Sequence, residues 1–259
     1  MGYNPFRVLR EMHKTGGGIK SLYGGYSANL FGRLQYLFIR NSLYKVIYDQ
    51  VKPRRATNDL TIHEKMVLSG FVGGFAAAFN TPFAIVSTRQ IIDTQIKKEW
   101  RRNYVSLSDG LKKCVTVDEL KKTGLINIVK HVLLNVTLTG PYDYIKKALF
   151  LRFGDYGFVG PLALFSAAVI SSLITLPVDN IRTRLMNAQK LTERNRLNYS
   201  GIIDIVVKSG LYEGSPAALW AGFYTYLIST LLYASLTVYV TDSITTSWKR
   251  GAGLKEWQL

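Results

Sequence analysis

The stretch LPVDNIRTRLMNAQ, residues 176–189, closes a run of 23 residues without a charged side chain. Within it, Pro177 and Asp179 are followed by Arg182 and Arg184. Charges at the end of a membrane-spanning helix are costly unless they reach water or an opposite charge. The spacing therefore predicts a functional cluster of charges at a helix end. What this cluster does depends on its ionic partners elsewhere in the chain.

Other segments of the chain are uncharged over a comparable length. Residues 66–86 and 220–241 hold 21 and 22 uncharged residues, and residues 156–178 hold 23. About 20 apolar residues cross the hydrocarbon core of a bilayer, so we expect three membrane helices. Two weaker spans, residues 29–48 and 125–145, carry isolated bases and predict helices that face a polar interior or a protein partner. The alternative for these two is a buried amphipathic helix.

The chain carries a formal net charge of +16, with 33 Lys and Arg against 17 Asp and Glu. Such a charge suits nucleic acid or an anionic membrane surface. Because the chain has several apolar spans, we expect membrane lipids and no nucleic acid as partners. The single cysteine excludes an internal disulfide framework. The three histidines are scattered, so we expect no catalytic residue, no metal site and no enzyme activity.

The chain contains an internal repeat with an offset of 95 residues. Pro82 and Pro177 each lie at the end of an uncharged run, and Arg89 and Arg184 each follow seven residues after their proline. Three further residues recur at the same offset: Tyr104 as Tyr199, Asp109 as Asp204 and Lys113 as Lys208. Each unit is expected to contain a span ending in proline, a basic loop with an amphipathic helix, a turn with glycine and a second span.

Residues 177–184 complete the pattern P-x-[D/E]-x-x-[K/R]-x-[K/R], and YSGIIDIVVKSGLYEGSPAALWAG (residues 199–222) follows with a short helix and a glycine-containing linker. On these motifs the chain resembles the mitochondrial carrier family over essentially its whole length. The resemblance implies an all-α membrane protein, a mitochondrial-carrier-like bundle of three pseudo-repeats with about five transmembrane helices plus short matrix-side amphipathic helices. It also implies a multi-pass protein of the mitochondrial inner membrane.

Within the family, GGYSANLFGRLQYLFIRNSLY (residues 24–44) most resembles the oxoglutarate/malate carriers. The expected organisation is a single carrier-like domain, residues 1–259, with an incomplete first repeat (1–57), a second repeat (58–151) and a third repeat (152–259). The first repeat is expected to lack its opening transmembrane helix. That loss would leave an open seam between the second and the sixth helices of the bundle.

In the family, an acid in each marker pairs with a base in the next repeat's marker and closes the matrix side. The second repeat keeps Pro82 and Arg89 but has Ala84 in the acidic position. Because the first marker is absent as well, the resemblance implies that all three bridges are lost. Asp179 and Arg182 would then pair only with each other, three residues apart on one helix.

A second network of charges closes the opposite side in the family. Tyr142, Asp143 and Lys146 match its signature [F/Y]-[D/E]-x-x-[K/R] on an even-numbered helix. Lys45 replaces the acid in the first repeat, and Asp242 in the third has no base three residues later. The resemblance therefore implies that this second network is broken too.

Cationic residues on the even-numbered helices hold carboxylates in the dicarboxylate-type members, and Arg can do so through two parallel hydrogen bonds. Arg40 and Lys130 stand at such positions, with Ser229 at the third. The resemblance makes these three the substrate-contact candidates. The alternative is that Arg40 and Lys130 pair with acids of a neighbouring subunit or reach the membrane interface.

Short glycine motifs beside expected helix N-termini resemble the family's cardiolipin sites, where backbone N–H groups meet a phosphate. The candidates are Gly24, Gly25, Tyr199, Gly201, Trp220 and Gly222. We therefore expect structural cardiolipin and no other cofactor. An aromatic anchor at the membrane interface is the alternative for these residues.

Taken together, the substitutions in the markers favour a structural function. The chain is expected to be transport-inactive and to act as an accessory subunit of a larger membrane complex of the respiratory-chain type. Other inner-membrane subunits of that complex would cover the open seam. The alternative is a functional antiporter of small dicarboxylates of the oxoglutarate/malate type.

Overall fold

The computed structural model describes residues 23–51, 60–94, 101–102, 104, 106–154, 156–187, 202–212 and 216–236, together with residues 10, 13, 18 and 19. Within these residues all regular structure is helical, which confirms the all-α fold class. The α-helices are α2 (Tyr26–Val51), α3 (Ile62–Asp93), α4 (Leu107–Cys114), α5 (Val117–Phe153), α6 (Val159–Asn187) and α7 (Ile202–Tyr212). A 3₁₀ turn, η4 (Pro216–Trp220), leads into a further helix at residues 223–236.

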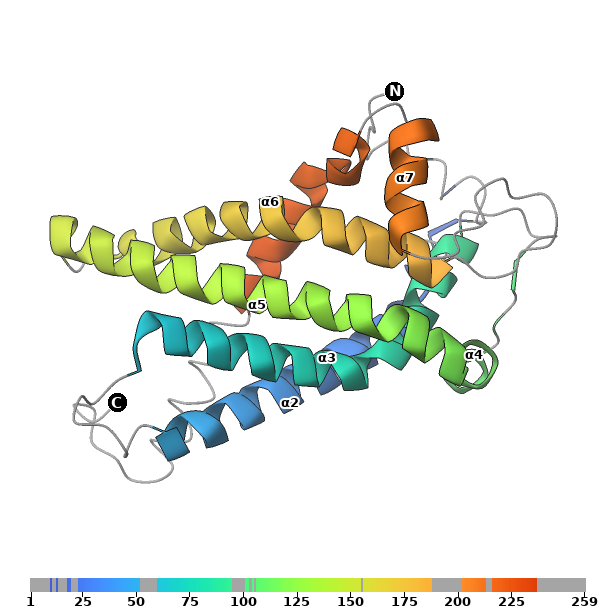
Figure 1. Cartoon of the computed structure of the whole chain (residues 1–259), viewed down its shortest axis with the longest axis horizontal. Coiled ribbons are helices and arrows are strands. Elements are labelled where there is room, and N and C mark those ends of the chain that lie inside the picture. The colour runs from blue at the N-terminus through green and yellow to red at the C-terminus, as the bar shows by residue number, and fades with distance from the viewer. Residues whose placement is uncertain are drawn as a thin grey trace.

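The long helices α2, α3, α5 and α6 form a bundle in chain order, and each is antiparallel to the one before it (Figure 1). Helix α2 packs on α3, α3 on α5, and α5 on α6. The short helices α4 and α7 both lie at the end of the bundle where α3 and α6 finish and α5 begins. We call this the α4/α7 end, and we call the other the opposite end.

Within the described part of the chain, three helices are long and apolar enough to cross a membrane: α3, α6 and the segment Ala217–Leu236. They coincide with the three uncharged runs of the sequence, except that residues 237–241 lie outside the described part of the chain. Helices α2 and α5 have 26 and 37 residues, so they are also long enough to span hydrocarbon at 1.5 Å per residue. The two weaker spans are therefore long continuous helices.

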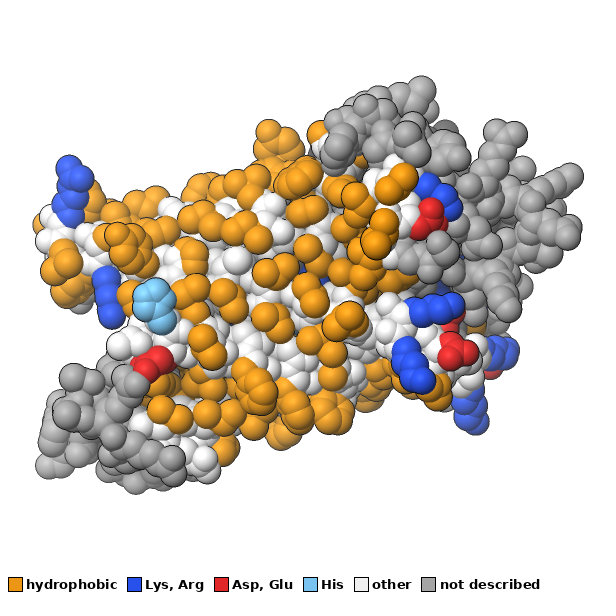
Figure 2. Space-filling model, in the orientation of Figure 1, with side chains coloured by type: hydrophobic (Ala, Val, Ile, Leu, Met, Phe, Trp, Pro, Cys, Tyr) orange, Lys and Arg blue, Asp and Glu red, His pale blue; other side chains and the backbone are white. Residues whose placement is uncertain are grey.

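The long helices present an apolar surface between charged ends. In Figure 2 hydrophobic side chains cover the face of the bundle, whereas Lys, Arg, Asp and Glu gather toward its two ends. On α3, Phe71, Phe75 and Phe79 recur every four residues and are 62%, 47% and 49% exposed. One helix face of this kind suits contact with lipid acyl chains.

Proline lies inside α3 and α6 rather than at their ends. Helix α3 continues from Pro82 to Asp93, and α6 continues from Pro177 to Asn187. A proline inside a helix removes one backbone hydrogen bond but does not require the helix to stop. The marker residues that follow Pro177 therefore project from a helix.

Glycines allow α3 to approach α5 closely. A Cβ atom on Gly70 would lie 2.8 Å from Val136 Cγ2, and one on Gly74 would lie 2.8 Å from Val132 Cγ2. Valine has little rotamer freedom in a helix, so neither side chain can easily move away. The small residues of α3 thus set the distance at which α5 lies, and α5 carries much of the site described below.

We predict that Gly74→Ala destabilises the bundle by about 1–3 kcal/mol, because the added methyl group overpacks the α3–α5 contact. The measurement is the thermal unfolding midpoint of the purified protein in mild detergent. Gly124→Ala is the matched control, because a Cβ at this helical position meets no atom within 4 Å. Equal midpoints for the two variants would contradict this account of the packing.

Candidate functional site

A cavity of about 220 Å³ lies among the helices, toward the α4/α7 end. Residues from α2, α3, α5, α6 and the 223–236 helix line it. Its charged lining residues are Arg33, Lys130, Asp179 and Arg182. We call it the Lys130 cavity. Among the described residues it therefore holds three cations and one carboxylate.

Asp179 joins two of these cations. Its Oδ1 atom lies 3.0 Å from Arg182 Nη1 on the same helix and 3.6 Å from Lys130 Nζ on α5. The Lys130 side chain is only 7% exposed, and a buried ammonium group needs an opposite charge. The carboxylate thus links α5 to α6 at the wall of the cavity.

A buried amide extends this link to α3. Arg182 Nε donates a 2.7 Å hydrogen bond to Asn127 Oδ1. The Asn127 amide nitrogen in turn donates to Thr81 Oγ1 at 2.9 Å and to the Ala77 carbonyl oxygen at 3.0 Å. Three helices therefore meet through one continuous set of polar contacts.

These contacts correct one expectation and confirm another. The expected pairing of Asp179 with Arg182 inside one helix is confirmed. The expectation that Asp179 has no base on a neighbouring helix is wrong, because Lys130 supplies one. Sequence reasoning assigned Lys130 to substrate and searched for partners only at marker positions, so this pair was missed.

A second buried cation, Arg89, also has a partner that sequence reasoning missed. Its Nη2 atom lies 2.8 Å from Glu119 Oε2, and its Nε donates to the Met186 carbonyl oxygen at 3.1 Å. Glu119 stands in the first turn of α5, after the N-cap Thr116, where a carboxylate is favoured. The three helices α3, α5 and α6 are thus tied together at the α4/α7 end.

A layer of buried polar side chains lies beyond the Lys130 cavity. Tyr36 on α2 is 2% exposed, and its hydroxyl oxygen accepts a 2.8 Å hydrogen bond from Asn135 Nδ2 on α5. The rings of Tyr36 and His131 lie 4.9 Å apart. His131 lines the Lys130 cavity, and Asn135 lines a second cavity, which lies toward the opposite end of the bundle. We call Tyr36, His131 and Asn135 the polar layer.

The cavity beyond this layer has a volume of about 530 Å³ and lies toward the opposite end of the bundle. Its charged lining residues are Arg40, Lys65, Asp143 and Lys146, and we call it the Arg40 cavity. Lys65 Nζ lies 4.0 Å from Asp143 Oδ2 and so pairs α3 with α5. The expectation that the Asp143 network is broken is therefore wrong in part, because Lys65 on α3 supplies Asp143 with a base.

The substrate-contact candidates are divided between the two cavities. Lys130 and Ser229 line the Lys130 cavity, whereas Arg40 lines the other one. Tyr142 and Lys146 lie near Arg40, with Lys146 Nζ 5.5 Å from the centre of the Tyr142 ring. Arg184 lies half-buried in the last turn of α6. The three candidates expected in one cavity thus lie on both sides of the polar layer.

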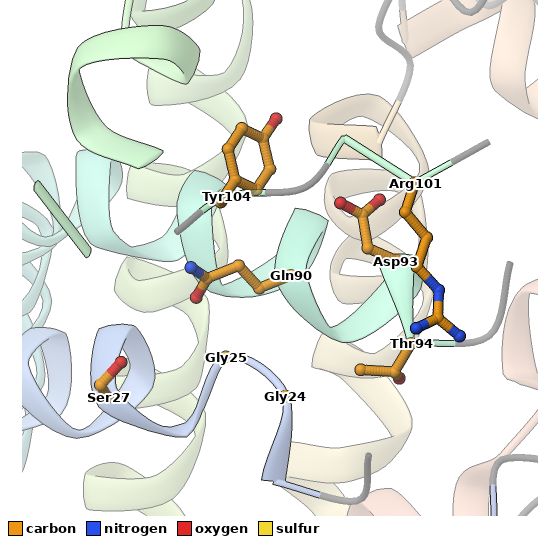
Figure 3. A pocket seen from close by; sticks show the side chains of 8 residues that line it. All are labelled: Gly24, Gly25, Ser27, Gln90, Asp93, Thr94, Arg101 and Tyr104. Atoms are coloured by element: carbon orange, nitrogen blue, oxygen red, sulfur yellow. The ribbon is translucent and has the colours of Figure 1, made fainter. Parts of the chain in front are cut away.

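Gly24 and Gly25 lie in a pocket of about 270 Å³ at the α4/α7 end, shown in Figure 3 with the Asp93 and Arg101 side chains at one side. Gly25 has φ +74°, and a Cβ there would lie 2.8 Å from the Ser87 carbonyl oxygen. The start of α2 therefore requires glycine.

The other lipid candidates lie apart from this pocket. Trp220 Nε1 donates a 3.0 Å hydrogen bond to the Leu173 carbonyl oxygen, and Gly222 has φ +85°. Tyr199, Gly201 and Asp242 lie outside the described residues. The structure therefore places four of the six lipid candidates.

Comparison with known proteins adds independent findings. The profile of the mitochondrial carrier protein family matches residues 161–251. A macronuclear solute carrier homolog of Oxytricha fallax is 27% identical over 250 residues, which cover 93% of this chain and 66% of the relative. The chain thus spans just under two thirds of that relative's length.

Two other relatives carry a substrate in their names. The probable mitochondrial 2-oxoglutarate/malate carrier protein of Dictyostelium discoideum is 27% identical over 249 residues, 94% of this chain and 77% of the relative. The mitochondrial 2-oxoglutarate/malate carrier protein of Mus musculus is 26% identical over 253 residues, 95% of this chain and 78% of the relative.

We predict that Glu119→Gln destabilises the protein by about 1.5–3 kcal/mol, because it removes the carboxylate charge that lies 2.8 Å from the fully buried Arg89 guanidinium. The measurement is again the unfolding midpoint in mild detergent. Asp118→Asn, at the exposed acid next to Glu119 in the same turn, is the control and should leave the midpoint nearly unchanged. Equal losses in both variants would show that the helix N-terminus, and not the buried pair, is responsible.

Proposed function

We propose that the chain belongs to the mitochondrial carrier family and is an antiporter of small dicarboxylates in the mitochondrial inner membrane, because the family profile matches residues 161–251 and solute carriers are similar to most of its length. In this proposal α2, α3, α5, α6 and the 223–236 helix are five transmembrane segments, and α4 and α7 lie on the matrix side. The observation that carries the proposal is the arrangement of two cation-rich cavities separated by one polar layer.

The charges of both cavities favour a doubly negative ligand. Each cavity is lined by three cations and one carboxylate among the described residues. In surroundings of low dielectric constant, an uncompensated positive charge strongly favours an anion. Arg33 and Arg40 can each bind a carboxylate through two hydrogen bonds. A volume of about 220 Å³ is below the roughly 300–1,000 Å³ of pockets for drug-sized ligands, which favours a small anion.

The arrangement also supports alternating access. The polar layer separates the cavities, and ion pairs tie the helices on both sides of it: Asp179 with Lys130 on one side, and Lys65 with Asp143 on the other. Breaking either pair exposes a charge unless an anion takes its place. A carboxylate substrate could supply that replacement and so make helix movement depend on its own binding.

The accessory-subunit function rested on a lack of ionic partners between the helices. Those partners are present, as Lys130 and Glu119 show. The names of the relatives are those of solute carriers, and they favour transport over a structural role. The transport assay described below, together with migration in mild detergent, distinguishes transport from association with other subunits.

We also propose that the pocket at Gly24 and Gly25 holds a phosphate group of cardiolipin. Helix α2 begins there, and the backbone N–H groups of a helix N-terminus attract anions. Arg101 lines the same pocket and adds a positive charge beside the Asp93 carboxylate, which pairs with Arg102.

We predict that purified protein in liposomes exchanges labelled oxoglutarate for internal malate. Arg40→Gln and Lys130→Gln should each lower the exchange rate at least tenfold, because each removes a cation from a cavity. Lys113→Gln is the control, because Lys113 is an exposed cation on α4 outside both cavities.

Folded wild-type protein that exchanges no dicarboxylate would contradict the proposed function. Co-migration with a respiratory complex in mild detergent, together with absent exchange, would favour the accessory-subunit role instead.

A further inference from the structure

We propose that Asp179 determines which anions are carried, by setting the net charge of the Lys130 cavity to +2. This inference rests on the proposed transport function. It names the charge of the substrate as the property by which the cavity selects it. Asp179 acts through its neighbouring cations, as a specificity-determining residue. The chain would then prefer dianions over monoanions and trianions of similar size.

The first support is the position of the carboxylate. Asp179 is the only acid among the described residues that line the cavity. Its Oδ1 atom contacts Arg182 at 3.0 Å and Lys130 at 3.6 Å. One carboxylate shared by two cations cancels one positive charge and leaves the other for a ligand.

The second support is the remaining cation. Arg33 lines the same cavity and forms no close ion pair with the residues that the structure describes, although its charge acts on the Asp179 carboxylate at longer range. Its guanidinium carbon lies 5.2 Å from the centre of the Tyr233 ring, a contact that orients the group without cancelling its charge. Arg33 therefore adds a second uncompensated positive charge to the cavity.

The third support is that the other nearby acids are engaged elsewhere. Glu119 pairs with Arg89, and Asp93 pairs with Arg102 at 3.2 Å. None of these four residues lines the Lys130 cavity. The charge that a ligand meets there is thus controlled by Asp179 and not by the surrounding ion pairs.

A fixed charge of this kind selects ligands by their own charge. A monoanion leaves one cation uncompensated, and a trianion brings one negative charge too many. The error costs most beside the buried Lys130 side chain, because an unpaired buried charge loses its hydration, and it costs less at the exposed Arg33. Only a dianion makes the loaded cavity neutral.

The test compares butanoate, succinate and propane-1,2,3-tricarboxylate as competitors of labelled dicarboxylate exchange in liposomes. Asp179→Asn raises the cavity charge to +3 and should shift the preference at least tenfold toward the tricarboxylate. Lys130→Gln lowers the charge to +1 and should shift it at least tenfold toward the monocarboxylate. The double variant has a charge of +2 again and should regain the dicarboxylate preference.

Asp204→Asn is the matched control, because Asp204 pairs with Lys208 on α7 outside the cavity. It should leave the order of the three competitors unchanged. If Asp179→Asn is not recovered as folded protein, Lys130→Gln and the double variant still test the inference. Adding Asp179→Asn to Lys130→Gln should shift the preference from the monocarboxylate back to the dicarboxylate.

Two results would overturn the inference. In one, Asp179→Asn lowers the exchange rate equally for all three acids, which indicates a purely structural role. In the other, the double variant keeps the preference of either single variant. Wild-type protein that transports no carboxylate at all would instead refute the proposed function, so the two failures are distinguishable.

Discussion

The Asp179 carboxylate, held between Lys130 and Arg182, is the interaction on which the rest of the site depends. It allows a buried lysine to remain in an apolar bundle, and it joins α5 to α6. Through Arg182 and Asn127 the same contacts reach α3. If the carboxylate were absent, Lys130 would be a buried charge without compensation, which is among the most destabilising features that a helix bundle can contain.

In the proposed function, the polar layer gives this charge cluster its role. Tyr36, His131 and Asn135 lie between two cavities that are each lined by more cations than acids. A bundle whose only purpose is to fill a membrane has no need of cations that line internal cavities, because apolar packing would be less costly. Their presence in both cavities is the physical argument for the proposed passage of an anion.

Much of the fold could be predicted from the sequence, because uncharged runs and helical spacing are local properties. The three strongest spans and the Asp179–Arg182 pair follow from such local patterns. The partners of Asp179, Arg89 and Asp143 on other helices could not be predicted, because they depend on how each helix is rotated about its axis. That rotation is fixed by contacts such as those of Gly70 and Gly74 with valines of α5. Lys130 was expected to contact substrate, but the sequence alone did not reveal that an acid of α6 already contacts it.

The proposed alternating access requires that the two cavities are reached from opposite sides of the membrane. The most direct measurement starts from Cys114→Ser protein in sealed liposomes and introduces Asn41→Cys or Ser229→Cys, one in each cavity. A membrane-impermeant thiol reagent is then added from one side at a time. The account predicts that each cysteine is modified from one side only and that the two sides differ. Modification of both cysteines from the same side, or of neither from any side, would contradict it.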